Sequence, residues 1–338
     1  MVELIARLSE AYGPPGAERV VRSIVEEESR PYADEIRTDV LGNLLVRKGS
    51  PEGPRIMISA HIDEIGLVVT YVDEKGFLRF HPAGGISPHV LLGQRVRFES
   101  GLVGAIGCEP VDDIKNVKME VLYIDIGSHN REEALAQVQP GDMCCWHRRL
   151  DQVGRRVIGK ALDDRIGCAA LLAALRRLDG KNIPNNVFFV FSVQEEVGLR
   201  GARTAAYGIK PALGLSVDVT GAGDTPAAKP LPMELGKGAA IKVKDSSLVC
   251  HPGVCRYLVE LAKKHNIAYQ MEVLPAGGTD AAAIQLSEAG VATGGLSIPT
   301  RYVHTPAEMA DLDDVEAVVA LLVELVSAPL DLSYINSL

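Results

Sequence analysis

Two adjacent carboxylates, Glu195 and Glu196, directly follow the most apolar segment of the sequence, VFFVFSV at residues 187–193. This segment is rich in β-branched and aromatic side chains, which predicts a buried central strand. Catalytic groups in open α/β sheets gather at the carboxyl ends of strands, so the position of the pair indicates a catalytic or metal-binding role. A divalent metal ion can hold two such carboxylates together, with one as a ligand and the other as a proton acceptor. An isolated pair of this kind more often consists of two surface acids on a solvated turn. Other segments of the sequence must therefore decide between this interpretation and a metal site.

Further imidazoles and carboxylates stand at the ends of other predicted elements. His61 and Asp63 follow a predicted strand at residues 56–60, Asp218 ends one at 212–218, His304 follows one at 292–298, and Asp163 and Asp164 begin a helix. Borderline metals such as zinc, cobalt and manganese prefer these ligands. All the groups fall on one predicted edge of the sheet. Two metal ions that share a carboxylate need roughly one imidazole and one further carboxylate each, plus a free base, and the sequence supplies this set.

The elements that must position these residues form two parts. Residues 1–69 and 156–338 alternate buried strand patterns with amphipathic helices, which predicts an α/β domain. Residues 70–155 contain short alternating runs and frequent glycine, with a helix predicted at 131–137, which indicates an inserted β-rich domain. The apolar loop at residues 85–92 of this insert favours a self-association surface.

Composition excludes several classes of partner. The 338-residue chain carries a net charge of −9, which argues against nucleic acid because phosphate binding requires a basic surface. No apolar run approaches the roughly 18 residues that span a bilayer, so we expect a cytoplasmic protein with no membrane partner. The six cysteines lack paired zinc-finger spacing and are interpreted as reduced thiols. The metal-like cluster of Cys250, His251 and Cys255 lacks a second ligand pair.

Successive motifs of the chain resemble, in the same order, those of the tetrahedral and glutamyl aminopeptidases, a group of dinuclear-metal enzymes that also carry the names cellulase M and endoglucanase. The motifs are AHIDEIG at residues 60–66, KALDDRIGC at 160–168, VQEEVG at 193–198, GA at 201–202, SVD at 216–218 and YVHTP at 302–306. LLGQR at 91–95 and LYIDIG at 122–127 resemble the second domain of that family. The resemblance implies a mixed-sheet α/β/α catalytic domain of the dinuclear-zinc exopeptidase type with a small inserted β-rich domain.

The resemblance also implies the metal ligands. It assigns one ion to His61 and Asp218, the other to Glu196 and His304, and the bridging position to Asp163. The expected cofactors are two divalent ions per subunit, Zn²⁺ or Co²⁺. Asp164 remains the alternative bridge, because the two aspartates are adjacent.

The implied activity is removal of N-terminal residues from peptides by a metal-bridging water, with Glu195 as the general base. Asp63 would orient an imidazole ligand or tune its basicity. Loops at residues 276–280 and 298–302 are candidates for the specificity pocket, and Arg301 is the nearby cation that would meet an acidic substrate side chain. The family forms dimers and tetrahedral dodecamers, so a homo-oligomer is expected.

Two other functions remain open at this point. One is another metal-dependent hydrolase on the same scaffold, such as a deacylase or carboxypeptidase, or the endoglucanase of the older family name. A glycosidase uses two carboxylates and no metal, so loss of activity with a chelator would separate these possibilities. The other is a non-catalytic scaffold that retains the motifs, although the candidate positions all carry residues that are competent for chemistry.

Overall fold

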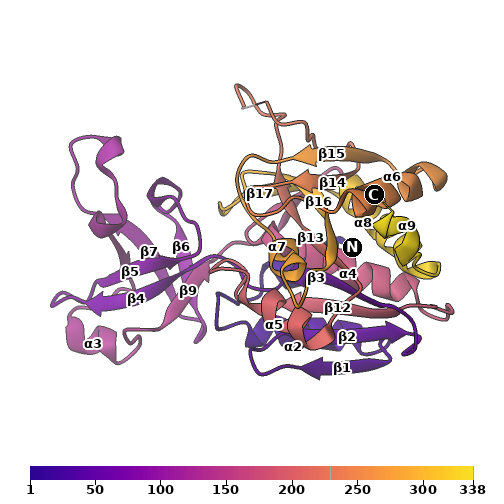
Figure 1. Ribbon diagram of the computed structural model, residues 1–338. Coiled ribbons are helices and arrows are strands. Elements are labelled where there is room, and N and C mark those ends of the chain that lie inside the picture. Colours follow the sequence, from indigo (N-terminus) through magenta and orange to yellow (C-terminus); the bar gives the residue numbers. More distant parts are fainter. Residues whose placement is uncertain (229, 338) are drawn as a thin grey trace.

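The computed structural model describes residues 1–228 and 230–337, which form a large mixed sheet covered by helices and a separate closed barrel (Figure 1). The barrel lies to one side of the sheet, and its strands come from one continuous part of the chain. A mixed α/β fold with an inserted β-rich part confirms the predicted fold class.

Among the described residues the large sheet has eleven strands. Its main order is β1-β2-β12-β3-β13-β16-β17-β11-β10, and β14 pairs with both β16 and β15. The bounds are β1 Glu35–Thr38, β2 Leu44–Gly49, β3 Arg55–His61, β10 Asp151–Val153, β11 Arg156–Gly159, β12 Asn186–Ser192, β13 Leu213–Gly221, β14 Ala239–Lys244, β15 Tyr269–Val273, β16 Ala292–Arg301 and β17 Glu308–Asp311. The four central strands β12, β3, β13 and β16 are parallel to one another, so their carboxyl ends share one edge.

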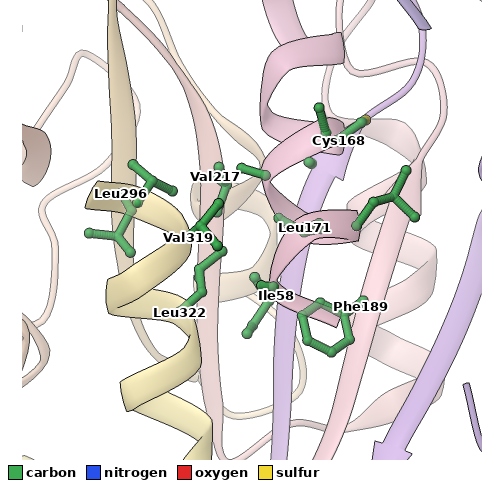
Figure 2. Packing of buried hydrophobic residues seen from close by; sticks show 14 of the residues in the cluster. Ile58, Cys168, Leu171, Phe189, Val217, Leu296, Val319 and Leu322 are labelled. Atoms are coloured by element: carbon green, nitrogen blue, oxygen red, sulfur yellow. The ribbon is translucent and has the colours of Figure 1, made fainter. Parts of the chain in front are cut away.

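Helices cover both faces of the large sheet. One face carries α1 Val2–Ser9, α2 Arg19–Ser29, α4 Leu162–Arg177, α6 Pro252–Lys264, α8 Leu312–Ser327 and α9 Leu332–Asn336, and the other carries α5 Arg200–Ile209 and α7 Asp280–Gln285. Ile58 and Phe189 pack toward α4, as Figure 2 shows, whereas Met57 and Val190 pack with α5 and α7. Burial on both faces explains why the central strands read as continuous apolar runs.

No helix within the described ranges combines the length and the apolar content that crossing a membrane requires.

The barrel closes in the order β4-β5-β8-β7-β6-β9 around its own apolar interior. Its elements are β4 Gly66–Val72, β5 Leu78–Ala83, β6 Arg95–Phe98, β7 Val103–Cys108, β8 Leu122–Asp125 and β9 Met143–Trp146, with α3 Arg131–Leu135 and the short 3-10 helices η1 Pro88–Val90, η2 Ile114–Asn116 and η3 Met119–Val121. Its strands therefore begin before residue 70, and β10, inside the predicted insert of residues 70–155, pairs in the large sheet. The division into two domains at those residues remains a prediction.

Candidate metal centre

A cavity of about 390 Å³ lies at the carboxyl edge of the large sheet and collects most of the candidate residues. Its lining includes His61, Asp163, Glu195, Glu196, Asp218 and His304. Asp63 is fully buried behind this lining. Residues that are more than 240 positions apart in the sequence thus meet at one site, because parallel strands bring their carboxyl ends together.

Two overlapping groups of metal donors face this cavity. The first comprises His61, Asp163 and Asp218, and the second comprises Asp163, Glu196 and His304; within each group the ligand atoms lie within 4.8 Å of one another. Asp163 belongs to both groups. Its Oδ1 lies 3.0 Å from His61 Nε2, and its Oδ2 lies 3.3 Å from His304 Nε2. One carboxylate therefore stands between two donor sets, which is the arrangement expected of a bridging ligand.

Backbone carbonyl groups fix both imidazoles. His61 Nδ1 lies 3.0 Å from the carbonyl oxygen of Asp63, and His304 Nδ1 lies 2.7 Å from the carbonyl oxygen of Gly85, in the segment after β5. A carbonyl oxygen can only accept a hydrogen bond, so each Nδ1 carries a proton. In the neutral imidazole the Nε2 lone pair then points toward the carboxylates, which suits a metal ligand.

The neighbouring Asp164 has a different role from Asp163. Its Oδ2 accepts a hydrogen bond from the backbone N–H of His61 (3.2 Å), and its Oδ1 accepts one from the N–H of Gly167 (3.1 Å). The second bond caps the regular part of α4, the helix that these two aspartates were predicted to begin. Because Asp164 is committed to backbone groups, Asp163 is the member of the pair that is available in the cavity.

Asp63, which was expected to orient an imidazole ligand or tune its basicity, contacts both His61 and the turn of the two glutamates. Its carboxylate accepts hydrogen bonds from the backbone N–H groups of Glu195 (3.0 Å) and Glu196 (3.1 Å). The same carboxylate lies 3.6 Å from His61 Nδ1, which is too far for a hydrogen bond. The carbonyl of Asp63 therefore orients the imidazole, while its side chain holds the turn that presents the two glutamates.

The electrostatics of the cavity favour cations. Burial raises the pKa values of Glu195, Glu196 and Asp218 above their ordinary values, and nearby carboxylates raise them further. Burial alone would lower the pKa of His304, but the carboxylates of Asp163 and Glu196, which lie 3.3 and 3.4 Å from its Nε2, raise it to about 12. Glu196 Oε1 is buried and has no hydrogen-bond partner among the described residues. Divalent ions would relieve the repulsion and supply the missing partner, so the donor set fits two such ions.

Glu308, which the sequence analysis did not identify, supports both donor groups. Its carboxylate accepts hydrogen bonds from the backbone N–H groups of Asp163 (3.1 Å) and His304 (2.9 Å). Burial is the main reason that its pKa rises to about 8. The one feature of the sequence that could have indicated this supporting role is its position four residues after His304.

A buried ion cluster of Glu64, Lys160 and Arg165 also went unrecognised in the sequence. Lys160 Nζ lies 2.5 Å and Arg165 Nη2 lies 3.5 Å from the Glu64 carboxylate, and the three side chains are at most 1% exposed. Arg165 Nη1 also donates to the carbonyl of Leu8 in α1 (2.7 Å). The cluster ties the segments that carry His61 and Asp163 to the N-terminal helix.

Several other sequence features lie away from the donor groups. Asp280 does not cap α7; it is buried and accepts a hydrogen bond from Ser192 Oγ (2.5 Å). The six cysteines are free, and neither Cys250 nor Cys255 joins a donor group in the described part of the chain. Of the two predicted specificity loops, residues 276–280 contribute Gly277 and Gly278 to the cavity lining. The prediction of a loop at 298–302 was wrong, because residues 298–301 continue strand β16, and none of the five is among the described lining residues.

Comparison with known proteins identifies relatives over nearly the full chain. The model of the M42 glutamyl aminopeptidase family matches residues 42–321. A putative aminopeptidase of Acetivibrio thermocellus is 48% identical and aligns with 96% of this chain and 98% of its own. The lysyl aminopeptidase of Pyrococcus furiosus is 36% identical, with 94% of each chain aligned.

Solved structures share the whole architecture. An aminopeptidase from the archaeon Desulfurococcus kamchatkensis superposes with a TM-score of 0.94 at 38% identity, covering 99% of this chain and 96% of its own. The TET1 peptidase of Pyrococcus horikoshii, which can assemble into a tetrahedron or a large octahedral shell, superposes with a TM-score of 0.88 at 34% identity. It covers 96% of this chain and 98% of its own.

Proposed function

The chain belongs to the M42 glutamyl aminopeptidase family, and we propose that it is a metal-dependent aminopeptidase in which Glu195 is the general base. The observation that carries this proposal is the pair of donor groups that share Asp163 beside a glutamate belonging to neither group. A binuclear hydrolase requires this combination of ligands and a free base.

In this proposal His61, Asp163 and Asp218 would hold one divalent ion, and Asp163, Glu196 and His304 would hold the other. Zn²⁺ and Co²⁺ suit the mixture of imidazole and carboxylate donors. When bound, the two ions would lower the pKa of a water molecule and stabilise negative charge on the substrate carbonyl oxygen.

The position and burial of Glu195 support its role in moving the proton. It lines the cavity, its Oε2 lies 3.9 Å from His61 Nε2, and its side chain is 10% exposed. Burial raises its pKa, whereas neighbouring positive charge lowers it, and a general base works best with a pKa near the operating pH. Glu195 accepts the proton of the attacking water and then donates it to the leaving nitrogen of the peptide.

The carboxylate outside both donor groups favours a peptide with a free N-terminus. A free α-amine is positively charged near neutral pH, and Glu195 offers it complementary charge when the other lining carboxylates hold the metal ions. An internal peptide bond carries no such charge. This difference supports exopeptidase action over cleavage within a chain.

We also propose that the protein forms a homo-oligomer, either a dimer or a tetrahedral dodecamer. Support comes from the assembly of the similar TET1 peptidase. The loop of residues 85–92 does not add to it, because its apolar side chains pack against the barrel core. Multi-angle light scattering after size exclusion tests this point. A monomer at micromolar concentration would contradict it.

The activity is tested with a leucine chromogenic anilide before and after treatment with a chelator. We expect the chelator to reduce the rate by about 100-fold or more, and Zn²⁺ or Co²⁺ to restore it. A cellulose oligosaccharide and an N-blocked leucine anilide serve as controls and should not be cleaved. Chelator-insensitive cleavage of the anilide, or cleavage of the oligosaccharide, would contradict the proposal.

A further inference from the structure

Beyond the donor groups and Glu195, the described residues that line the cavity are uncharged. Its apolar lining residues are Leu199, Val219, Leu274 and Val303, whereas the hydroxyl group of Thr220 donates to the buried carboxylate of Glu272 (3.0 Å). The remaining described lining residues outside the donor groups and Glu195 are glycines. A substrate side chain that leaves the metal centre in this direction therefore meets an apolar surface.

Arg301, the cation expected to bind an acidic substrate, already has a partner. Its Nε and Nη2 each lie 2.7 Å from a carboxylate oxygen of Asp224. Both side chains are 16% exposed, and the pairing raises the pKa of Arg301 and lowers that of Asp224. Two parallel hydrogen bonds satisfy both charges, so this arginine is not available to a substrate carboxylate.

We propose, on the basis of the aminopeptidase function proposed above, that the enzyme selects peptides whose N-terminal side chain is uncharged and predominantly apolar. Leu274 and Val303 form the contact surface for that side chain. A charged side chain would lose water and gain no partner of opposite charge from the described residues of the wall. The relative from Pyrococcus furiosus carries the name lysyl aminopeptidase, so the proposal separates this chain from that relative.

The size of the expected discrimination follows from the burial of an unpaired polar group. Such burial costs about 1 to 3 kcal/mol in proteins, which corresponds to a factor of about 5 to 150 in kcat/KM. Glutamate and glutamine have nearly the same shape, so a comparison of these two substrates isolates charge from size. Leucine and methionine substrates measure the preference for an apolar side chain, and a lysine substrate measures the effect of a positively charged one.

The experiment measures kcat/KM of the metal-loaded enzyme for the Leu, Met, Gln, Glu and Lys anilides. We expect Leu and Met to be cleaved fastest, and Gln to be cleaved at least about fivefold better than Glu. Cleavage of Glu or Lys as fast as Leu would overturn the specificity and leave the aminopeptidase function intact. Absence of cleavage of all five anilides would instead overturn the proposed function and the specificity with it.

Two variants assign the preference to the cavity wall. Leu274→Arg places a cation at the apolar surface and should raise the ratio of Glu to Gln cleavage by about tenfold or more. Arg301→Gln is the matched control and should change that ratio by less than about threefold, because Arg301 does not contact the substrate. A fall of more than about threefold in the ratio of Glu to Gln cleavage in Arg301→Gln, relative to the wild type, would overturn the assignment. The wild-type panel decides the proposal independently if either variant fails to fold.

Discussion

The large sheet and the barrel have similar apolar interiors but very different polar residues. In the sheet, parallel strands bring acidic and imidazole side chains to one edge, and buried charges such as Glu308 and the Glu64 cluster support them. In the barrel, the described residues contribute no member to a candidate metal group. Parallel strands that end together concentrate chemistry at one place, whereas a closed antiparallel barrel mainly buries its interior.

The two regions nevertheless touch at the candidate site. The carbonyl of Gly85, just beyond β5 of the barrel, accepts the Nδ1 proton of His304. An exposed ion pair between Arg19 and Glu99 also joins the two regions at 2.7 Å. The barrel therefore contributes to the site through its backbone, while the reacting groups come from the large sheet.

The largest expected effect comes from the free base of the large sheet. Glu195→Gln should reduce kcat by about 10² to 10⁴ because general acid–base catalysis is worth that factor. Bound metal should stay unchanged, since Glu195 belongs to neither donor group. Steady-state kinetics and metal analysis of the same preparation measure both quantities. More than about a tenth of the wild-type kcat in the variant would contradict the assigned role.

The buried ion cluster beneath the site should control stability. Glu64→Gln leaves Lys160 and Arg165 without their carboxylate partner, and removing one member of a buried ion group costs about 3 to 5 kcal/mol. The matched control is Glu99→Gln, which breaks the exposed pair with Arg19 and should cost less than about 1 kcal/mol. Urea unfolding measures both free energies. Equal losses in the two variants would contradict the difference between the buried and exposed pairs.

A smaller effect is expected where the barrel meets the metal centre. A Cβ at Gly85 would lie 3.2 Å from His304 Nδ1, so Gly85→Ala should displace the imidazole and lower metal affinity by about tenfold. Gly208→Ala in α5 is the control, because a Cβ there meets no atom within 4 Å. Competition with a chromogenic chelator measures the affinity. Unchanged zinc affinity in Gly85→Ala would show that the barrel does not position this ligand.

The smallest effect on catalysis is expected on the barrel surface. Ile114 is 59% exposed on the barrel, and Ile114→Glu should leave kcat within about twofold of the wild type. Light scattering on the same sample reports whether this surface takes part in assembly. A large loss of kcat with unchanged mass would contradict the separation of chemistry from the barrel surface.

The sequence was sufficient to predict the fold class and the residues that gather at the cavity. Apolar runs such as residues 187–193 identify central strands, and the polar residues that follow them meet at the edge where parallel strands end. The choice of Asp163 over Asp164 also agrees with the geometry, because Asp164 is committed to backbone groups. The catalytic and metal roles of these residues remain predictions.

The sequence could not predict contacts that depend on tertiary packing. Nothing in a local pattern indicates that Glu308 accepts two backbone hydrogen bonds or that Glu64 is buried between two cations. The pairing of Arg301 with Asp224 joins residues 77 positions apart, so Arg301 could be mistaken for a substrate contact. The short strands β10, β11 and β17 were also missed, since three or four residues carry too little periodicity.

The most direct test is the anomalous X-ray diffraction of crystals grown with Zn²⁺. We predict two zinc peaks per chain, one in contact with His61 and Asp218, the other in contact with Glu196 and His304, and both in contact with Asp163. A single peak, or peaks at other residues, would contradict the binuclear centre on which the proposed function depends.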